Sequence, residues 1–563
     1  MGSGSAGRRI GTTAGVAAAY AVLTVVMTWP FANYGHFATA SYGGDQRLII
    51  WTLAWDNHAV LHWLHLFSSN VFFPARDSLR YNEHLFGVSL VTLPMAAAGI
   101  SPVLAHNITW WLAFFLNGLV VFAWIRRFVD DRLAAFAGSL VFACSSYVML
   151  HVHAHLHLVW LWPLPASALL LERWFRQPSV PRVAAWLAVV LMGILTSWYL
   201  AVIVALVNAA TGLGLVLTPP DKDAPGLWRR RVVHIACAAV LTAAVVDPFA
   251  RQYVGLRINP AEAAFYAPDL ASYLVPPENT LMGGWWKAHV DGRPRPLFGE
   301  QTLFAGWIAM SLGIVGLVVL VRGRTVPRMA WVCPLLLAGG FLLSLGPSPP
   351  LLGGPALAPF GWLARLPGFS GMRAPGRFGL VCMMGLSGLA AIGASTISRR
   401  LGKMGPAAVV LLVPLMLAEW FVVGFPSGKP EPEGIPSIYL TPQVRSARAI
   451  ASLPEYRDRV DWFKGSDYLY YSTAHWRPIV NGFGRSEPEN QATVIQAVRG
   501  FAVDPAPARA LGVQYVVVHS ARLEGAERRL VDTALGNPLC RLASQVGDDY
   551  LFELLDVPAR ARR

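Results

Sequence analysis

Long apolar stretches separated by short polar loops fill the chain from its amino terminus to about Phe425. We distinguish about eleven of them, each close to the roughly 20 residues that a helix needs to cross the hydrocarbon core of a bilayer. From Pro426 onward the pattern changes to a polar tail that runs to Arg563. The pattern therefore predicts an α-helical polytopic membrane domain over residues 1–425 and a second domain over residues 426–563.

Composition and loop charges add an orientation to this picture. Hydrophobic residues make up 55% of the chain and charged residues only 14%, as is typical of membrane proteins. Arginine and lysine gather in every second gap between the apolar stretches. Short loops that stay in the cytoplasm are typically rich in these two residues. These gaps hold Arg8 and Arg9, Arg126 and Arg127, residues 173–182, residues 222–231, residues 322–328 and residues 399–403. The sequence thus predicts a protein of the bacterial cytoplasmic membrane with a cytoplasmic amino terminus and an extracytoplasmic tail.

The net charge of +14 could suggest a nucleic-acid partner. Most of the excess lies in the inner loops, however, where it is explained by topology and by contact with anionic lipid headgroups. Because no DNA-binding motif accompanies the charge, we expect membrane lipids and no nucleic acid among the partners.

The first outer loop, about residues 31–105, is unlike an ordinary loop. Between Gly44 and Phe67 apolar residues recur at nearly the helical period, with histidines and Trp51, Trp55 and Trp63 among them. We expect a helix that lies in the membrane plane, with these tryptophans at the headgroup level. The apolar segment 85–100 contains Pro94 and is predicted to be in-plane or re-entrant, because a crossing there would invert the charge pattern that follows.

The tail shows the signals of a small α/β or α+β domain. Residues 513–518 form a short apolar run typical of a buried strand, residues 550–554 another, and residues 527–535 a helix between them. The segment 468–476 before them is rich in aromatic residues.

Several short motifs, all in predicted outer segments, carry a family resemblance. They are Gly44-Asp45 followed by Trp51 and Trp55, Tyr81-Asn82-Glu83-His84, the histidines of 151–157, Met372 to Phe378, and Ser472 to Trp476 with Asn481-Gly482. In order and placement the chain resembles the GT-C superfamily of membrane glycosyltransferases, and in particular a poorly characterised bacterial group in or beside it. The resemblance implies a first span, a long outer loop with a catalytic acid, a helical bundle and an outer carboxy-terminal domain.

Asp45 and Glu83 are the candidate catalytic residues. The resemblance places the base that deprotonates the acceptor in the first outer loop, and Asp45 follows two glycines where a helix begins. The alternative for Asp45 is an ordinary helix cap, and Asp56 is the second choice as base. Glu83 precedes the second in-plane segment, and its alternative is a solvated loop residue.

Four cationic or ionisable residues are candidates for binding the donor phosphate: Arg373, Arg377, His84 and His155. An arginine can grip a phosphate with two hydrogen bonds, and the two here flank Pro375 and Gly376. The alternatives are arginines that reach to the interface and histidines that only decorate it. Glu83 with His84, or the alternating histidines of 151–157, would also suit a divalent metal, although no D-x-D motif occurs in the first outer loop.

The resemblance therefore implies an inverting glycosyltransferase that moves a sugar from a polyprenyl-phosphate donor to a glycan, lipid or protein acceptor at the outer face. A transporter or flippase of lipid-linked saccharides is one alternative, but Asp247 and Glu419 are nearly the only acidic residues at span depth, and no repeat is visible. A non-catalytic membrane scaffold is the other. It would not need acid, histidine and arginine motifs on one side.

Overall fold

The structure is a computed structural model. It describes residues 3–31, 38–39, 44–151, 155–218, 226–254, 260–290, 299–323, 326–347, 349, 358–366, 369, 372–423, 431–432, 434–457, 459–484 and 486–556. The chain divides into two compact units. Unit 1 comprises residues 1–33 and 108–427, and unit 2 comprises residues 34–107 and 428–563. The first outer loop thus groups with the tail.

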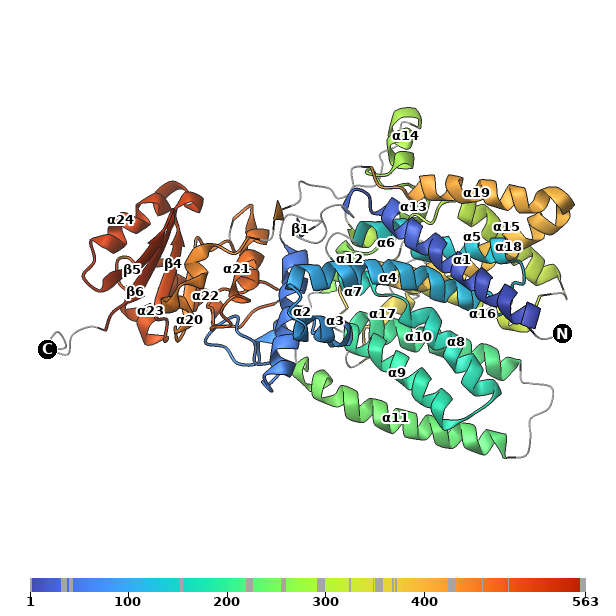
Figure 1. The fold of residues 1–563 in the computed structure, drawn as a ribbon, viewed down its shortest axis with the longest axis horizontal. Helices are drawn as coiled ribbons and strands as arrows, with labels where there is room; N and C mark the ends of the chain where they lie inside the picture. The colour runs from blue at the N-terminus through green and yellow to red at the C-terminus, as the bar shows by residue number, and fades with distance from the viewer. Residues whose placement is uncertain are drawn as a thin grey trace. The chain divides into compact units, whose positions relative to one another are not determined.

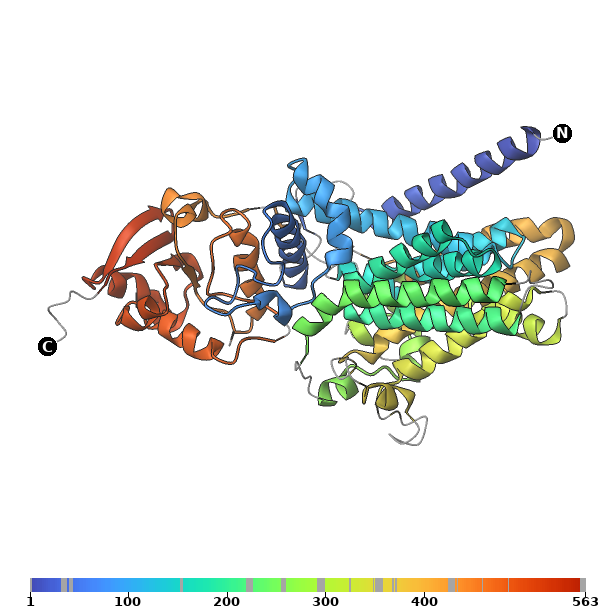
Figure 2. The ribbon, with the colours of Figure 1, turned by 90° about the horizontal axis from the view of Figure 1, so that it is seen from below.

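Unit 1 is built from helices that run side by side (Figures 1 and 2). Its long helices are α1 (Ser3–Met27), α4 (Pro102–Ile125, of which residues 102–107 belong to unit 2), α5 (Arg132–Ala143), α8 (Pro163–Arg176), α9 (Val180–Thr196), α10 (Trp198–Leu217), α11 (Leu227–Gln252), α15 (Trp307–Arg322), α16 (Val332–Ser344), α18 (Gly379–Arg400) and α19 (Gly405–Trp420).

Shorter pieces connect these helices. They are α6 (Ser146–His151), α7 (Leu156–Val159), α12 (Pro260–Phe265), α13 (Leu270–Leu274), α14 (Leu281–His289), α17 (Pro359–Leu363) and the 3-10 turns η3 (Gly299–Gln301), η4 (Arg328–Trp331), η7 (Pro375–Phe378) and η8 (Gly402–Met404).

The helices have the length and composition of a multi-pass membrane protein. Among the described residues, five are long and apolar enough to span a bilayer: α4, α10, α11, α18 extended by η7, and α19 together with η8. Several others, including α5, α9, α15 and α16, are apolar but shorter. The chain is therefore a multi-pass membrane protein, as predicted, while the count of eleven spans stays a prediction.

Helix α18 forms the centre of unit 1. It is buried along nearly its whole length, packed against α5, α15 and α16. Small residues make this packing close: a methyl group on Gly316 of α15 would meet the Leu389 carbonyl, and one on Gly393 of α18 would meet the Leu312 carbonyl. Close backbone approach through small residues is the usual way in which membrane helices associate.

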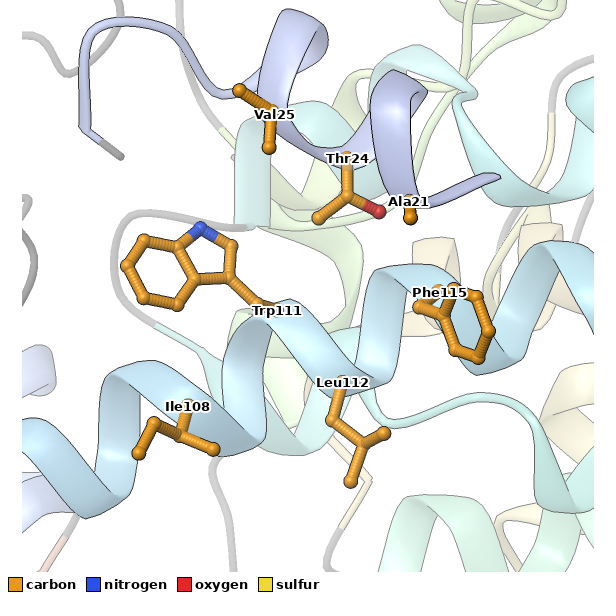
Figure 3. Close-up of a pocket in the computed structure, with 7 residues that line it drawn as sticks. All are labelled: Ala21, Thr24, Val25, Ile108, Trp111, Leu112 and Phe115. Atoms are coloured by element: carbon orange, nitrogen blue, oxygen red, sulfur yellow. The ribbon is translucent and has the colours of Figure 1, made fainter. Parts of the chain in front are cut away.

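An apolar hollow lies between α1 and α4 (Figure 3). Its volume is about 510 Å³. The lining consists of Ala21, Thr24, Val25, Ile108, Trp111, Leu112 and Phe115. The Thr24 hydroxyl already donates to the Tyr20 carbonyl at 2.8 Å, so this hollow suits hydrocarbon and not a charged ligand.

Unit 2 joins a helical layer to a mixed sheet (Figure 1). Its helices are α2 (Asp45–Leu61), α3 (Phe86–Ala97), α20 (Pro442–Arg445), α21 (Gly465–Ser472), α22 (Gln491–Arg499), α23 (Ala506–Ala510) and α24 (Leu530–Leu535). Its strands are β1 (Ala38–Thr39), β2 (Glu431–Pro432), β3 (Ile450–Leu453), β4 (Tyr515–His519), β5 (Cys540–Val546) and β6 (Asp549–Leu554). The 3-10 turns are η2 (Ser78–Tyr81), η9 (Ser437–Leu440), η10 (Trp462–Lys464), η11 (Ser520–Arg522) and η12 (Gly525–Arg529).

The main sheet has the order β3-β4-β6-β5. Strands β3 and β4 are parallel, with Ile450 opposite Tyr515, and the other pairs are antiparallel. Strands β4 and β6 lie at the two apolar runs for which strands were predicted. All five residues of β4 are buried, as expected for an apolar run that forms a strand. Strands β1 and β2 form a separate two-residue ladder.

Helix α2 coincides with the helix predicted for the first outer loop, but its tryptophans differ from expectation. Trp51 and Trp55 are buried, and their indole nitrogens donate to the Asn70 side chain and the Leu66 carbonyl. Only Trp63, with 95% of its surface exposed, is free to meet headgroups. The expectation for Trp51 and Trp55 is wrong because α2 packs against both α3 and α21, so most of its faces are covered.

Candidate functional site

The candidate residues fall into one group in each unit. Asp45, Glu83 and His84 belong to unit 2, whereas His155, Arg373 and Arg377 belong to unit 1. Each group is described within its own unit.

Asp45 occupies the first turn of α2, directly after Gly44. Gly44 has a positive φ of 64° and is the N-cap residue of α2. As a glycine, it has no side chain that could cap the helix. An L-residue rarely adopts this conformation, so glycine is required where the chain turns into the helix. Asp45 is therefore not the cap itself. It lies one residue further on, at the positive end of the helix dipole, where a carboxylate is favoured.

Two contacts fix the start of α2 against the carboxy-terminal part of unit 2. The Gly44 N–H donates to the Phe463 carbonyl at 3.3 Å. Two residues after Asp45, the Arg47 guanidinium binds Asp467 of α21 at 2.8 Å, and both side chains are largely buried. Asp467 also lies 3.6 Å from Arg522. These buried charges hold the helix entry, and thereby the backbone of Asp45, in one place.

Asp56, the second choice as base, is fully buried between α2 and α3. The Ser89 hydroxyl donates to its Oδ2 at 2.6 Å, and its Oδ1 has no hydrogen-bond partner among the described residues. Burial raises the pKa of Asp56 well above its usual value, partly opposed by the Ser89 hydrogen bond. A buried, neutral carboxyl has no access to an acceptor, so the geometry favours Asp45 over Asp56.

Glu83 and His84 lie between η2 and α3, with Glu83 half-buried and His84 buried. Burial lowers the pKa of His84 to about 4, although Glu83 partly opposes the shift. His84 is thus neutral at neutral pH and brings no positive charge to a phosphate. The neighbouring Asn82 donates to the Phe483 carbonyl at 3.1 Å, which ties this segment to the carboxy-terminal part of the unit.

In unit 1, Arg377 is buried in an ion pair that the sequence did not reveal. Its Nε and Nη2 donate to Glu300 Oε1 at 3.0 and 2.6 Å, and the guanidinium lies 4.0 Å from the centre of the Tyr199 ring. Tyr147 donates to Glu300 Oε2 at 3.3 Å, and His151 Nε2 lies 4.0 Å from the same oxygen. Burial alone would raise the pKa of Glu300, but the Arg377 charge outweighs it and lowers that pKa to about 2.

Gly376 makes this ion pair possible. A methyl group at Gly376 would lie 1.9 Å from the Glu300 carbonyl oxygen, so only glycine lets η7 approach η3 this closely. Glu300 of η3 was not among the predicted site residues, because its segment of the sequence has no hydropathy pattern or motif. The one available signal was indirect: an arginine buried in an apolar segment needs a carboxylate.

Arg373, four residues earlier, has a different environment. About a third of its side chain is exposed, and its nearest carboxylate is Glu262 at 3.9 Å, itself 43% exposed. The Tyr199 hydroxyl accepts the backbone N–H groups of Arg373 and Ala374 at 2.6 and 3.0 Å, which fixes the backbone while the side chain stays accessible.

The histidine corner is only partly described. His151 ends α6, His155 precedes α7, and their Nδ1 atoms are 3.3 Å apart, so one ring donates to the other. His153 lies outside the described residues. Within the described part of the chain, no group of three His, Cys, Asp or Glu side chains is arranged to hold a metal ion.

The acidic residues at span depth have local explanations. Glu419 accepts hydrogen bonds from the backbone N–H groups of Trp307 and Ile308, at the first turn of α15. Asp247 pairs with Arg251 one turn further along α11 at 2.8 Å. Neither arrangement resembles an ion path through a bundle.

Comparison with known structures shows what the fold is similar to. The chain is similar to the arabinofuranosyltransferase AftD from Mycobacteria, with a TM-score of 0.62, 15% identity and 96% of this chain covered. It spans about 40% of the length of that AftD chain. The fold is that of the GT-C superfamily of membrane glycosyltransferases, as the motifs predicted.

A family model for the "domain of unknown function (DUF6311)" matches residues 16–418, more than half of the chain. The chain therefore belongs to the DUF6311 family. A search of curated protein sequences found no match.

Two further solved structures are similar at lower scores. One is the archaeal oligosaccharyltransferase AglB from Archaeoglobus fulgidus in complex with an inhibitory peptide and a dolichol-phosphate, with a TM-score of 0.48 and 14% identity, over 93% of this chain and 71% of that one. The other is ArnT from Cupriavidus metallidurans bound to undecaprenyl phosphate, with a TM-score of 0.47 and 11% identity, over 96% and 98%.

Proposed function

We propose that this protein is a GT-C-type glycosyltransferase that transfers a sugar from a polyprenyl-phosphate donor to an acceptor at the outer face of the cytoplasmic membrane. The observation that carries the proposal is the position of Asp45. Within a GT-C fold, it is an acidic residue at the first turn of α2, and the helix entry is held by the Gly44–Phe463 hydrogen bond and the Arg47–Asp467 ion pair.

In the proposed reaction, Asp45 accepts the proton of an acceptor hydroxyl as its oxygen attacks the anomeric carbon of the donor sugar. The bond from that carbon to the phosphate oxygen breaks, and the phosphate leaves with the electron pair. A single displacement of this kind inverts the anomeric centre. Glu83 is the second carboxylate of the proposed site, on a segment that Asn82 ties to Phe483.

For the donor phosphate we favour Arg373 over Arg377. Arg373 keeps a partly exposed guanidinium, with a long contact to Glu262 and the Tyr266 ring centre 5.7 Å away, so a phosphate can compete for it. Arg377 is committed to Glu300 and holds the segment that carries Arg373. His155, and not the neutral His84, is the histidine that we retain as a possible phosphate contact.

We propose the donor from the chemistry of the fold class. The sugar is not specified, and the acceptor is a glycan, a lipid or a protein. The orientation is also a proposal: the loop charges predict that unit 2 faces the outside.

Replacing Asp45 by asparagine tests the function. The substitution keeps the size of the side chain but removes its charge and its capacity to accept a proton. We expect expression and melting temperature near wild type, with transfer reduced by about two to four orders of magnitude, the span of a lost general base. The measurement is incorporation of radiolabelled sugar from a panel of polyprenyl-phosphate-linked donors, with purified protein in lipid nanodiscs.

Asp56→Asn and Glu83→Gln are the matched controls. If Asp45→Asn keeps its activity while one of these is inactive, the base is misassigned and the class of enzyme stands. If all three variants transfer sugar at the wild-type rate, none of these carboxylates is the base; if wild type transfers no sugar from any donor of the panel, the enzymatic function is wrong.

A further inference from the structure

Two aromatic rings in unit 2 stack face to face at its surface. Trp462 of η10 and Phe483 have ring centres 5.3 Å apart and planes inclined by only 11°. Phe483 is buried, whereas 54% of Trp462 is exposed. We call this pair the aromatic platform. Because Phe483 supports one face of the indole, the exposed surface of Trp462 is held in a fixed orientation at little cost in side-chain entropy.

The aromatic platform is attached to both candidate carboxylate segments. Phe463, next to Trp462, accepts the N–H of Gly44, the residue before Asp45. Phe483 accepts from the Asn82 side chain, the residue before Glu83. The segments around Gly44 and Asn82 therefore both contact the part of the chain that carries the platform. Gly44 precedes the candidate Asp45, and Asn82 precedes the candidate Glu83.

The turn that carries Trp462 also carries charged side chains: the Trp462 N–H donates to the Arg459 carbonyl at 3.2 Å, and the Lys464 N–H donates to the Asp461 carbonyl at 2.9 Å. Asp461 binds Lys464 at 3.1 Å and Arg459 at 3.1 Å, and Arg459 also binds Glu524 at 2.9 Å. These groups can donate and accept hydrogen bonds. A flat apolar face on a turn with such groups matches a sugar ring, which has C–H groups on its face and hydroxyl groups at its edge.

We propose that the aromatic platform binds a sugar ring of the acceptor, which makes the acceptor a glycan or a glycosylated molecule. The inference rests on the proposed function and specifies its acceptor. A lipid surface is the competing occupant, because Val460, two residues away, is fully exposed. The charged groups of the same turn and the two carboxylate segments favour the sugar, and vesicle binding is tested as the opposing outcome.

The test compares Trp462→Ala, Trp462→Phe and Val460→Ala in the full-length protein in nanodiscs. Short octyl glycosides, including an arabinofuranoside and a mannopyranoside, serve as the probe, and saturation-transfer NMR reports their binding. We expect Trp462→Ala to weaken binding by about 3- to 10-fold, the range of one aromatic stacking contact, and Trp462→Phe to restore part of it. Val460→Ala should bind as wild type does.

Three results would overturn the platform: no saturation transfer to any glycoside in wild type, equal glycoside binding by Trp462→Ala, or a full-length Trp462→Ala variant in nanodiscs that loses binding to phosphatidylglycerol vesicles but not to glycosides. Melting temperatures of all three variants establish that folding is intact. Because Trp462 is exposed, we expect them to agree within the error of the measurement.

The platform and the enzymatic function fail separately. If Asp45→Asn abolishes transfer while Trp462→Ala leaves the acceptor KM unchanged, the platform is wrong and the enzyme stands. If wild type binds glycosides through Trp462 but transfers no sugar from any donor, the platform stands and the proposed function is wrong.

Discussion

Two buried arginine–carboxylate pairs, one in each unit, differ in the second group that contacts the carboxylate. In unit 1, Arg377 binds Glu300, which also accepts from the Tyr147 hydroxyl, a neutral donor. In unit 2, Arg47 binds Asp467, which also lies 3.6 Å from Arg522, a second cation. In both units the less buried candidate residue, Arg373 or Asp45, is a few positions from the buried arginine. In both units the buried pair holds the segment that carries the candidate.

The comparison predicts the largest effect for Arg377→Ala. This change leaves Glu300 buried with no strong cation, and breaking a buried pair in this way costs about 3 to 5 kcal/mol. Arg373→Ala, in the same motif, should change stability by less than about 0.5 kcal/mol while raising the donor concentration needed for transfer. Thermal unfolding in detergent, followed for both variants, checks the difference. Equal losses of stability would show that the two arginines have the same structural role.

Arg47→Ala should have an intermediate effect. Asp467 keeps Arg522 at 3.6 Å after the change, so its charge is not left alone. We expect a loss of about 1.5 to 3 kcal/mol, the range of one charge-assisted hydrogen bond, and a fall in transfer because the start of α2 is less fixed. Chemical denaturation and the transfer assay measure the two effects. A variant with lower stability but wild-type transfer would separate Arg47 from the positioning of Asp45.

Asp56 provides a smaller effect than Arg47, with the opposite sign, because no cation pairs with it among the described residues. Its pKa is raised by burial, so its contribution to stability is present below pH 3.8 and is lost as the pH rises through the raised value. Asparagine can still accept the Ser89 hydrogen bond and does not ionise. Asp56→Asn should therefore gain on the order of 1 kcal/mol over wild type at alkaline pH, and less at acid pH.

Melting temperatures of Asp56→Asn and wild type, measured from pH 5 to pH 9, check the sign. Glu300 should behave in the reverse way: its lowered pKa adds stability above pH 4.5 that is lost as the pH falls toward about 2. A constant difference between Asp56→Asn and wild type across the pH range would show that Asp56 is already ionised in the folded protein.

Much of the fold was predictable because its signals are local. The apolar stretches, the helix that begins after Gly44 and the strands β4 and β6 each follow from a pattern within one short segment. The GT-C resemblance was confirmed for the same reason, since its motifs lie at the ends of these segments. The roles of Asp45 and Glu83 as catalytic residues, and of His84, His155, Arg373 and Arg377 as phosphate ligands, stay predictions.

The sequence by itself determined the membrane class, the GT-C fold and the position of Asp45 at the start of a helix, since hydropathy, glycine and helix termini act over a few residues. Only the tertiary structure decided which charges are paired. Glu300 and Arg377 are 77 residues apart, and Arg47 and Asp467 are 420 apart. The same holds for the burial of Trp51 and Trp55, which depends on α21 packing against α2. Burial and pairing set whether a charge is available, and they arise from contacts between segments that no local pattern records.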